Sequence, residues 1–274
     1  MKIICLVENT AKDDRLLSEH GLSFYIETSH HRVLFDLGAT GAIIDNAKTL
    51  GIDLTQVDTV VISHGHIDHG GGLLAFLNMN AHAKIYVHPE AFDNHFSQRN
   101  DAYVSIGLDD SLMPHNQIVF TKNTTKIDEE LLIFSDVQEE TFKPIANQGL
   151  YKRSEKGNYQ LDDFRHEQHL IVTDHNKHVL FTGCGHRGII NILNTAIYRK
   201  GIHPDIIIGG FHLSRRHGQV EEPVAVIKTI GTYLKETKSM FYTGHCTGVN
   251  PYHHLKKIMQ EQLHYIQTGD VITP

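Results

Sequence analysis

The sequence predicts an α/β fold built from two similar halves, and three observations lead to this prediction. Short apolar runs typical of strands alternate with amphipathic segments of helical period along the whole chain. Two pairs of apolar segments recur at one spacing. Clusters of histidine, aspartate and cysteine directly follow predicted strands, at the edge where α/β sheets place their functional groups.

The first part of the chain shows the clearest alternation of strands and helices. Its predicted strands are residues 2–7, 22–27, 32–37, 57–63 and 84–88, and the fourth is rich in β-branched residues. Residues 41–50 have apolar positions at helical spacing and stop at Gly51, so they predict a helix. Residues 72–77 predict a second helix.

The stretch from about residue 89 to residue 125 is the least regular part of the chain. It is polar and contains histidines and scattered aromatic residues, so we interpret it as an insertion with a short helix near residues 91–96. Further strands are predicted at residues 131–135, 170–173, 179–182, 205–208 and 240–242, and helices at residues 188–200, 221–235 and 252–262. No low-complexity linker separates these parts, so we expect one domain over residues 1–274.

An internal repeat relates the two halves. Residues 33–35 (VLF) recur at residues 179–181, an offset of 146 (179 − 33), and the run that ends at His66 recurs as the run that ends at His212, again at 146 (212 − 66). Each copy carries a predicted helix between its two strands. Two βαβ halves of one design predict a pseudo-symmetric four-layer sandwich, and they place His212 at the strand-end position of His66.

Composition excludes several functional classes. The 274 residues are 40% hydrophobic and 21% charged, as in globular proteins, and no apolar run approaches the ~20 residues that span a bilayer. The N-terminal apolar stretch is too short for a signal peptide, so we expect a cytoplasmic protein with no membrane partner. A net charge of −7 disfavours a nucleic-acid partner, and three cysteines do not make a disulfide framework. The oligomeric state stays open.

The strongest chemical signal is the run SHGHIDHGGGL at residues 63–73. His64, His66, Asp68 and His69 directly follow a buried predicted strand and precede a predicted helix. His64 and His66 are two apart in extended chain, so they converge on one cation, whereas Asp68 and His69 face a second position. Imidazole and carboxylate ligands suit Zn²⁺, with Fe or Mn as alternatives.

This motif, together with GCGHRG at 183–188, GGFHL at 209–213 and GHCTG at 244–248, resembles the metallo-β-lactamase superfamily. The set is most similar to a branch described as pterin-related or dihydropteroate-synthase-like metal-dependent hydrolases. The resemblance covers nearly the whole chain, from residue 2 to about residue 266. It implies the αββα sandwich of that superfamily and a binuclear metal centre, with two zinc ions as the expected cofactor.

The resemblance also implies metal ligands at later strand ends. His245 matches the last histidine of the family, a ligand of the second metal, and His186 is expected to be the third ligand of the first metal. Cys184 stands where most members have an aspartate that bridges both metals. A thiolate can bind zinc, but a bystander role for Cys184 stays open. Glu167 and His169 are further possible ligands.

His212, Arg187 and Phe92 are the predicted substrate contacts. Since the first metal already has its ligands, we expect His212 to bind substrate and to act as a general acid, with a structural histidine as the alternative. Arg187 and the basic residues 215–217 are candidates for holding an anionic group such as phosphate, although a solvated loop is equally consistent for residues 215 and 216. Phe92 lies in the insertion that is expected to enclose the substrate.

These features predict a metal-dependent hydrolase. A water molecule activated by two zinc ions would attack a small anionic ester, phosphoester or pterin-linked metabolite, with Asp68 orienting the nucleophile. Two alternatives stay open. One is a synthase or transferase of pterin metabolism that uses the metals to bind a phosphate, and the other is a non-catalytic metabolite sensor.

Overall fold

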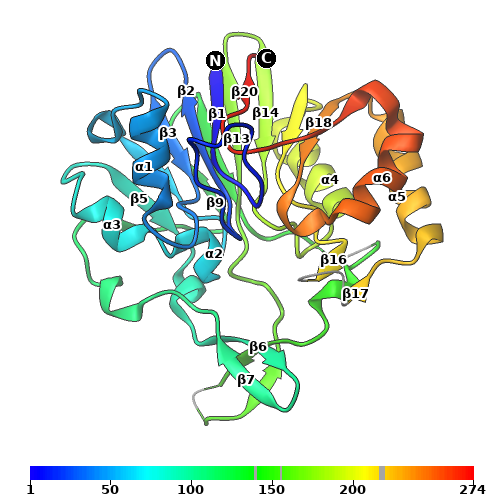
Figure 1. Ribbon diagram of the computed structural model, residues 1–274, viewed down its shortest axis with the longest axis horizontal. Coiled ribbons are helices and arrows are strands. Elements are labelled where there is room, and N and C mark those ends of the chain that lie inside the picture. The colour runs from blue at the N-terminus through cyan, green and yellow to red at the C-terminus, as the bar shows by residue number, and fades with distance from the viewer. Residues whose placement is uncertain (139–140, 155, 216–219) are drawn as a thin grey trace. The chain divides into compact units, whose positions relative to one another are not determined.

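Two seven-stranded sheets carry most of the regular structure of this chain (Figure 1). The computed structural model describes residues 1–138, 141–154, 156–215 and 220–274, and each sheet belongs to one of two units. Unit 1 consists of residues 1–122, 149–168 and 267–273, and unit 2 consists of residues 123–148, 169–266 and 274. Each unit is therefore assembled from segments that are far apart in the sequence.

The sheet of unit 1 combines an antiparallel and a parallel part. Its strand order is β20 (Val271–Ile272), β1 (Lys2–Val7), β2 (Ser23–Glu27), β3 (Arg32–Phe35), β4 (Thr59–Val61), β5 (Lys84–Val87) and β8 (Ile118–Phe120). Neighbouring strands are antiparallel from β20 to β3 and parallel from β3 to β8. The helices α1 (Ala42–Thr49) and α3 (Leu73–Leu77) cover this sheet (Figure 1), and Ile43 and Phe76 are buried with its strand residues in one core.

The sheet of unit 2 has the same construction. Its strand order is β9 (Thr124–Lys126), β10 (Leu131–Phe134), β13 (His169–Asp174), β14 (Lys177–Phe181), β15 (Ile206–Ile208), β18 (Met240–Thr243) and β19 (Leu263–Tyr265). Its core joins these strands to the helices α4 (Ile189–Lys200), α5 (Val224–Glu236) and α6 (Val249–Met259). Each of the three helices contributes several buried side chains to that core, among them Leu193, Ile230 and Leu255.

The predicted internal repeat is confirmed by the strand pairings. In both sheets, three antiparallel pairings are followed by three parallel ones, from β20 to β8 in unit 1 and from β9 to β19 in unit 2. The ladder Phe24↔Phe35 of β2 and β3 recurs as Leu170↔Phe181 of β13 and β14, an offset of 146 at both ends. The two units are thus two copies of one strand design.

The repeat slips by one residue at the next strand. Leu34 pairs with Val60 in unit 1, whereas Leu180 pairs with Ile207 in unit 2, so β4 and β15 are offset by 147 (207 − 60). By this register His212 corresponds to Gly65, and the prediction that it occupies the place of His66 is wrong by one residue.

The prediction of a helix near residues 91–96 is wrong. Pro89–Phe92 forms a short 3-10 turn, and His95–Arg99 is the strand β6, in which more and less buried side chains alternate with the period of a strand. A four-stranded sheet in unit 1 has the order β12 (Tyr159–Leu161), β11 (Leu150–Arg153), β6 and β7 (Ala102–Ser105). Part of the stretch predicted as irregular therefore forms strands. Its strand β6 pairs with β11, and the paired residues Phe96 and Tyr151 are 55 positions apart in the sequence (151 − 96).

The remaining elements are short or shifted by a few residues. The helix predicted at residues 221–235 begins only at Val224, because Pro223 precedes it and Glu221 belongs to the strand β17 (Val220–Glu221), which pairs with β16 (Ser214–Arg215). The helix predicted at residues 252–262 runs over Val249–Met259 and is followed by a 3-10 turn.

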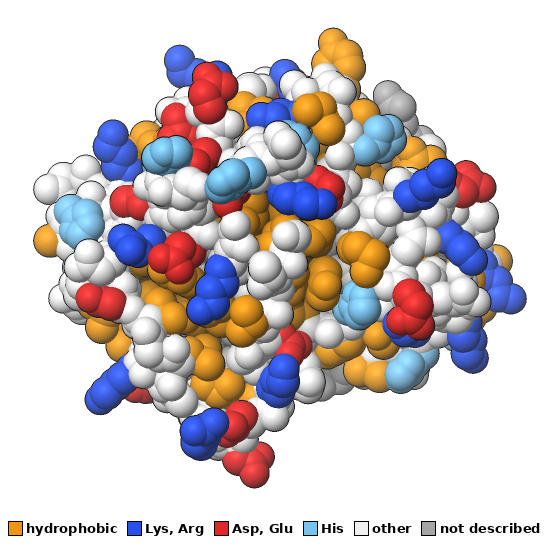
Figure 2. Space-filling view, turned by 90° about the horizontal axis from the view of Figure 1, so that it is seen from above, with side chains coloured by type: hydrophobic (Ala, Val, Ile, Leu, Met, Phe, Trp, Pro, Cys, Tyr) orange, Lys and Arg blue, Asp and Glu red, His pale blue; other side chains and the backbone are white. Residues whose placement is uncertain are grey.

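Two further observations concern membrane-spanning helices and the charges on the surface. None of the helices in the described ranges is both long and apolar enough to cross a bilayer. On the face drawn in Figure 2, Lys and Arg side chains are interspersed with Asp and Glu side chains. Among the side chains drawn on that face, the cations do not gather into the stripe that nucleic-acid binding uses.

The close contacts around Gly209 show how tightly the strand ends of unit 2 are packed. Its φ angle is 140°, and a Cβ atom at this position would lie 1.9 Å from the carbonyl oxygen of Thr182. A Cβ atom on Gly210 would lie 2.4 Å from the sulfur of Cys246. The two glycines therefore serve the packing of β14, β15 and the segment after β18.

We predict that Gly209→Ala lowers the free energy of unfolding by about 3 kcal/mol or more, because it combines a backbone clash with an unfavourable φ angle. Gly51→Ala is the matched control, since Gly51 also has a positive φ angle of 71° but has nothing within 4 Å of an added Cβ. That control should cost about 1 kcal/mol. Denaturant titration measures both values, and equal losses would refute the packing argument.

Candidate metal centre

Residues 63–69 occupy the loop that leaves β4 and the short helix α2 (Ile67–Gly70). His64, His66 and His69 are buried, and Asp68 is half-buried. The motif thus lies at the carboxyl end of a parallel strand, as its position in the sequence predicts.

A buried carboxylate, Asp36, organises this loop. It follows β3, and its Oδ1 accepts the backbone N–H of Ser63 at 2.7 Å. Its Oδ2 accepts the Ser63 hydroxyl at 2.7 Å and the Nδ1–H of His69 at 2.7 Å. Asp36 has a φ angle of 62°, a conformation that costs a non-glycine residue of order 1–3 kcal/mol. The backbone strain is tolerated at the point where three hydrogen bonds converge.

These hydrogen bonds fix the tautomers of two histidines. The Ser63 hydroxyl donates to Asp36, so it accepts from Nδ1–H of His64, which lies 2.9 Å away. His69 donates its Nδ1–H to Asp36. Both rings therefore carry their lone pair on Nε2, which is the form that a metal ligand requires.

The ligand atoms have spacings that suit cations. Nε2 of His64 lies 3.1 Å from Nδ1 of His66, and two nitrogen ligands of one tetrahedral Zn²⁺ are about 3.3 Å apart. Nε2 of His69 lies 3.8 Å from Oδ2 of Asp68. His64 with His66, and Asp68 with His69, thus form the two donor pairs that the sequence predicts.

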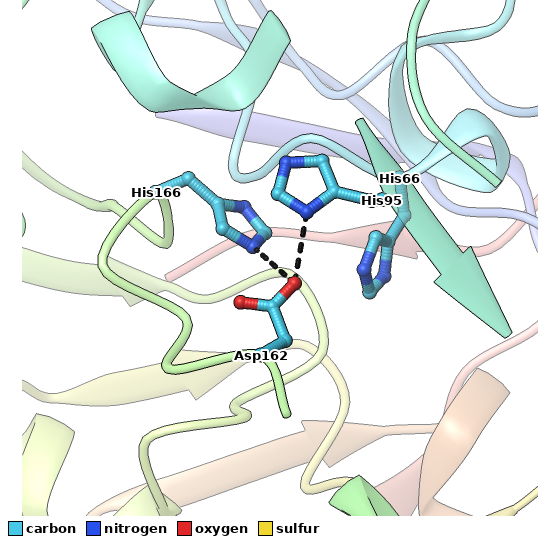
Figure 3. Close-up of side chains that lie close together, drawn as sticks. All are labelled: His66, His95, Asp162 and His166. Carbon is cyan, nitrogen blue, oxygen red and sulfur yellow. Dashed lines mark hydrogen bonds and ion pairs between the residues drawn. The ribbon is translucent and has the colours of Figure 1, made fainter. Parts of the chain in front are cut away.

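Three more side chains lie beside His66 (Figure 3). They are His95 from β6, and Asp162 and His166 from the segment after β12. All four side chains are buried, and one donor atom of each lies within 4.8 Å of the others. A group of three histidines and one aspartate is a candidate for a metal site by composition.

The hydrogen bonds indicate that this group is an internal network. Nδ1 of His166 accepts the backbone N–H of Gly65 at 2.9 Å, so the ring proton sits on Nε2, which faces Oδ2 of Asp162 at 3.3 Å. His95 faces acceptors at both ring nitrogens, Oδ2 of Asp162 at 2.8 Å and the carbonyl oxygen of Glu90 at 3.2 Å. A neutral His166 held in this tautomer has no lone pair for a metal, so the group supports the loop around Gly65 instead.

Burial sets the protonation states of this network. It lowers the pKa of His166 to about 4, helped by the charge of His95, and it holds the pKa of His66 well below the usual range. Burial alone would raise the pKa of Asp162, but His166 and His95 together bring it far below its ordinary value. His66 is therefore neutral at neutral pH, as a metal ligand must be.

Unit 2 contains a second group of donors. Cys184 and His186 lie between β14 and α4, and His212 lies after β15; one donor atom of each is within 4.8 Å of the others, and all three side chains are buried. The side chain of Asn147 accepts from Nδ1 of His186 at 2.9 Å and donates to its carbonyl oxygen at 2.8 Å. Asn147 therefore directs the lone pair of His186 to Nε2.

His245 and Cys246 stand next to this group. Cys184, His245 and Cys246 also have donor atoms within 4.8 Å of one another. Burial alone would raise the pKa of the Cys246 thiol, but Cys184 and His212 bring it well below its ordinary value. The Cys246 sulfur lies 3.4 Å from the carbonyl oxygen of Cys184. His245 has a φ angle of 51°, again a strained value at a predicted ligand.

Other residues predicted for the site have structural contacts. Arg187 donates its Nε–H to the carbonyl oxygen of Val137 at 3.1 Å, and Phe92 is buried in the core of unit 1. Glu167 is fully buried in unit 1. Residues 216 and 217 lie outside the described residues. These contacts give Arg187 and Phe92 packing roles, and the prediction that they bind substrate gains no support from them.

His169 is a core residue of unit 2. Its Nδ1 lies 3.1 Å from the hydroxyl of Thr182, and its ring packs against Phe134 with 5.1 Å between ring centroids. Burial, with a smaller effect of Arg187, lowers the pKa of His169 to about 3. These contacts place the Nδ1 side of its ring in the core of unit 2.

The sequence interpretation missed Asp36, Asn147 and the network of His95, Asp162 and His166. A signal existed for Asp36, because it ends a predicted strand parallel to the one that carries the histidine motif. The other residues come from irregular segments whose positions follow only from long-range pairing.

Comparisons with known proteins agree with this description. A family model described as the metallo-β-lactamase superfamily matches residues 19–146. A protein of Methanocaldococcus jannaschii named 7,8-dihydropterin-6-methyl-4-(β-D-ribofuranosyl)-aminobenzene-5′-phosphate synthase is 27% identical, over 99% of this chain and 96% of its own length.

Two solved structures extend the likeness. Tm1679, described as a metal-dependent hydrolase of the β-lactamase superfamily, has a TM-score of 0.84 at 27% identity, covering 100% of this chain and 99% of its own. Zn²⁺-bound PqqB from Methylobacterium extorquens has a TM-score of 0.56 at 11% identity, with full coverage of both chains. The second likeness concerns the fold alone.

Asp36→Asn should weaken metal binding by about 10–100-fold, because the amide that replaces Oδ2 or Oδ1 no longer accepts all three hydrogen bonds that orient Ser63 and His69. Competition with a chromophoric chelator measures the affinity. Asp45→Asn, an exposed change on α1, is the control and should leave the affinity unchanged. An unaltered affinity in Asp36→Asn would show that the carboxylate does not support the ligands.

The free energy of unfolding should decrease as the pH falls, partly because His169 takes up a proton only in the unfolded chain. Its folded pKa of about 3 lies below the unfolded value of about 6.5, so between these pH values only the unfolded chain takes up the proton. From pH 6.5 to pH 5 this contributes a loss of about 1.5 kcal/mol in the free energy of unfolding. His169→Asn, which can still bond Thr182, should remove that part of the pH dependence. Denaturation in the presence of chelator, compared with the wild type, tests this; identical slopes would contradict it.

Proposed function

This chain belongs to the metallo-β-lactamase superfamily, and from that premise we propose that it is a metal-dependent hydrolase of a small anionic metabolite. The observation that carries the proposal is the orientation of His64 and His69. Ser63 and Asp36 hold their Nδ1–H groups, so both Nε2 lone pairs are directed to coordination.

The donors of unit 1 fit bound cations. His64 and His66 form one pair and Asp68 and His69 the other, at the spacings described above. The predicted ligands of unit 2, Cys184, His186 and His245, are proposed to coordinate as well. Zinc is the proposed metal, because imidazole and thiolate donors favour it over Mg²⁺. Two zinc ions would supply a water molecule that ionises near pH 7.

The protein's own groups have distinct tasks in this proposal. Asp68 would hold a cation with one carboxylate oxygen and would use the other to orient the attacking water. Asp36 holds His69 in the tautomer that has its proton on Nδ1 and its lone pair on Nε2. His20, whose Nε2 lies 3.4 Å from Oδ2 of Asp68, is placed to donate a hydrogen bond to that carboxylate and limit its rotation.

A second candidate function is favoured by the archaeal relative. The name of that relative describes the synthesis of a compound that joins a dihydropterin methyl group to a ribosyl aminobenzene phosphate. The two sequences align over 99% of this chain at 27% identity. In that case the same cations would hold a phosphate, and the reaction would be a condensation.

We predict that the purified protein contains about two metal ions per chain and loses activity with a chelator. Asp68→Ala should abolish turnover and remove part of the metal without unfolding the protein. Asp14→Ala, an exposed change, is the control. Elemental analysis and a turnover assay measure the two effects. Full activity in Asp68→Ala, or well under one metal ion in wild-type protein, would refute the proposal.

The two candidate functions are separated by their products. A panel of carboxylic esters, lactones and phosphodiesters tests hydrolysis, and mixtures of an activated dihydropterin with an aminobenzene ribosyl phosphate test condensation. Metal-dependent release of acid or alcohol supports the hydrolase, whereas a metal-dependent C–N bond between the two reactants supports the synthase. Turnover of neither class by metal-loaded protein would favour a sensor.

A further inference from the structure

Two cysteines of unit 2 lie side by side although they come from different loops. Cys184 follows β14, and Cys246 lies 62 positions later in the 3-10 turn after β18. Their sulfur atoms are within 4.8 Å of one another, and neither cysteine is in a disulfide. Since an S–S bond is about 2 Å long, the two atoms need to approach by no more than about 3 Å to form one.

The surrounding backbone leaves room for both sulfur atoms. A Cβ atom on Gly210 would lie 2.4 Å from the sulfur of Cys246 and 3.4 Å from the Cα atom of Cys184. Gly185 and Gly248, which lie close to the two cysteines in the sequence, have φ angles of 74° and 80°. Other residues rarely adopt such angles, so glycines shape both loops that carry the thiols.

The third cysteine of the chain provides a contrast. Cys5 is the only cysteine of unit 1, and its side chain is fully buried in β1. Cys184 is 3% exposed and Cys246 is 8% exposed. A small oxidant in solution therefore has most access to Cys246, and the thiol nearest to Cys246 along the oxidation pathway is that of Cys184.

We propose that Cys184 and Cys246 are a redox-sensitive pair, which hydrogen peroxide converts into an intramolecular disulfide and a dithiol reduces again. The Cys246 sulfur attacks one peroxide oxygen, the O–O bond breaks, water leaves and a sulfenic acid remains. The Cys184 sulfur then attacks the Cys246 sulfur, the S–O bond breaks and a second water leaves. Two thiols and one peroxide thus give one disulfide and two water molecules.

The disulfide would act on the metal centre. Its sulfur atoms carry no thiolate charge, so Cys184 would cease to be a ligand. This consequence rests on the proposed function, in which Cys184 coordinates a cation, whereas the disulfide itself requires only the two thiols. The pair deepens that proposal, because metal binding by unit 2 would then depend on the oxidation state of the protein.

The first test treats chelator-stripped protein with hydrogen peroxide, alkylates the remaining thiols and maps the peptides without reduction. The proposal expects the Cys184 peptide linked to the Cys246 peptide within one chain, two thiols fewer per chain, and recovery of both with dithiothreitol. Cys5→Ser is the matched control and should give the same link. Cys184→Ser should instead stop at a sulfenic acid on Cys246, which dimedone traps. Circular dichroism verifies that both variants are folded.

The second test compares the Zn²⁺ affinity of oxidised and reduced wild-type protein by competition with a chromophoric chelator. We expect oxidation to weaken binding by more than about 10-fold and dithiothreitol to restore it. Because this test and the peptide map of the wild type need no variant, they stand even where a substitution unfolds the protein.

The outcomes are separable from those of the proposed function, because no substrate is present. Thiols that survive peroxide, sulfinic acids as the only products, or links only between chains would overturn the pair. A disulfide that forms without a change in Zn²⁺ affinity would overturn the switch and remove Cys184 from the proposed ligands. A protein that fails every hydrolysis assay but forms the disulfide and loses Zn²⁺ affinity would still have the redox-sensitive pair.

Discussion

The buried carboxylate of Asp36 is the constraint on which the histidine loop depends. It accepts three hydrogen bonds, two from Ser63 and one from His69, and its backbone N–H donates to Val61 on the neighbouring strand. An isolated carboxylate in such a place would cost several kcal/mol. The hydrogen bonds offset part of that cost, and a cation held by His69 would offset more. Asp36 therefore links the strand pairing of β3 and β4 to the tautomers of two candidate ligands, and the order of the loop follows from the register of the sheet.

The duplicated design separates the scaffold from the chemistry. The hairpins β2–β3 and β13–β14 match at an offset of 146, and the strand order and directions are the same in both units. The strand ends have diverged. In the register of β4 and β15, His64 of unit 1 corresponds to Phe211, which is buried in the core of unit 2. Unit 1 presents nitrogen and oxygen donors, whereas unit 2 presents sulfur and nitrogen donors. A strand pattern depends on apolar periodicity, which many residues satisfy, so its end residues are free to change.

The network around Gly65 shows how a metal motif is supported from a distance. A Cβ atom on Gly65 would lie 2.2 Å from the carbonyl oxygen of Ala91 and 2.8 Å from Nε2 of His95. The Gly65 N–H donates to His166, whose proton is held by Asp162. The glycine between the two histidines is therefore needed for close packing. The residues that lie against it come from β6, from the 3-10 turn before β6 and from the segment after β12. These contacts give the stretch after β5 a role in the site that differs from enclosing a substrate.

The sequence by itself determined the fold class, most strands and helices, the internal repeat and the four donors of the histidine motif. These features depend on neighbours along the chain, because periodicity and motif spacing are local properties. Only the tertiary structure decided which atoms of those donors are presented, through Asp36 and Ser63, and which residues surround His66. It also decided the place of His212, since a single extra residue between two strands shifts the register and no local pattern records it. Hydrogen bonds such as that between Gly65 and His166 join positions about 100 residues apart, and they follow from strand pairing, which the sequence pattern alone leaves undetermined.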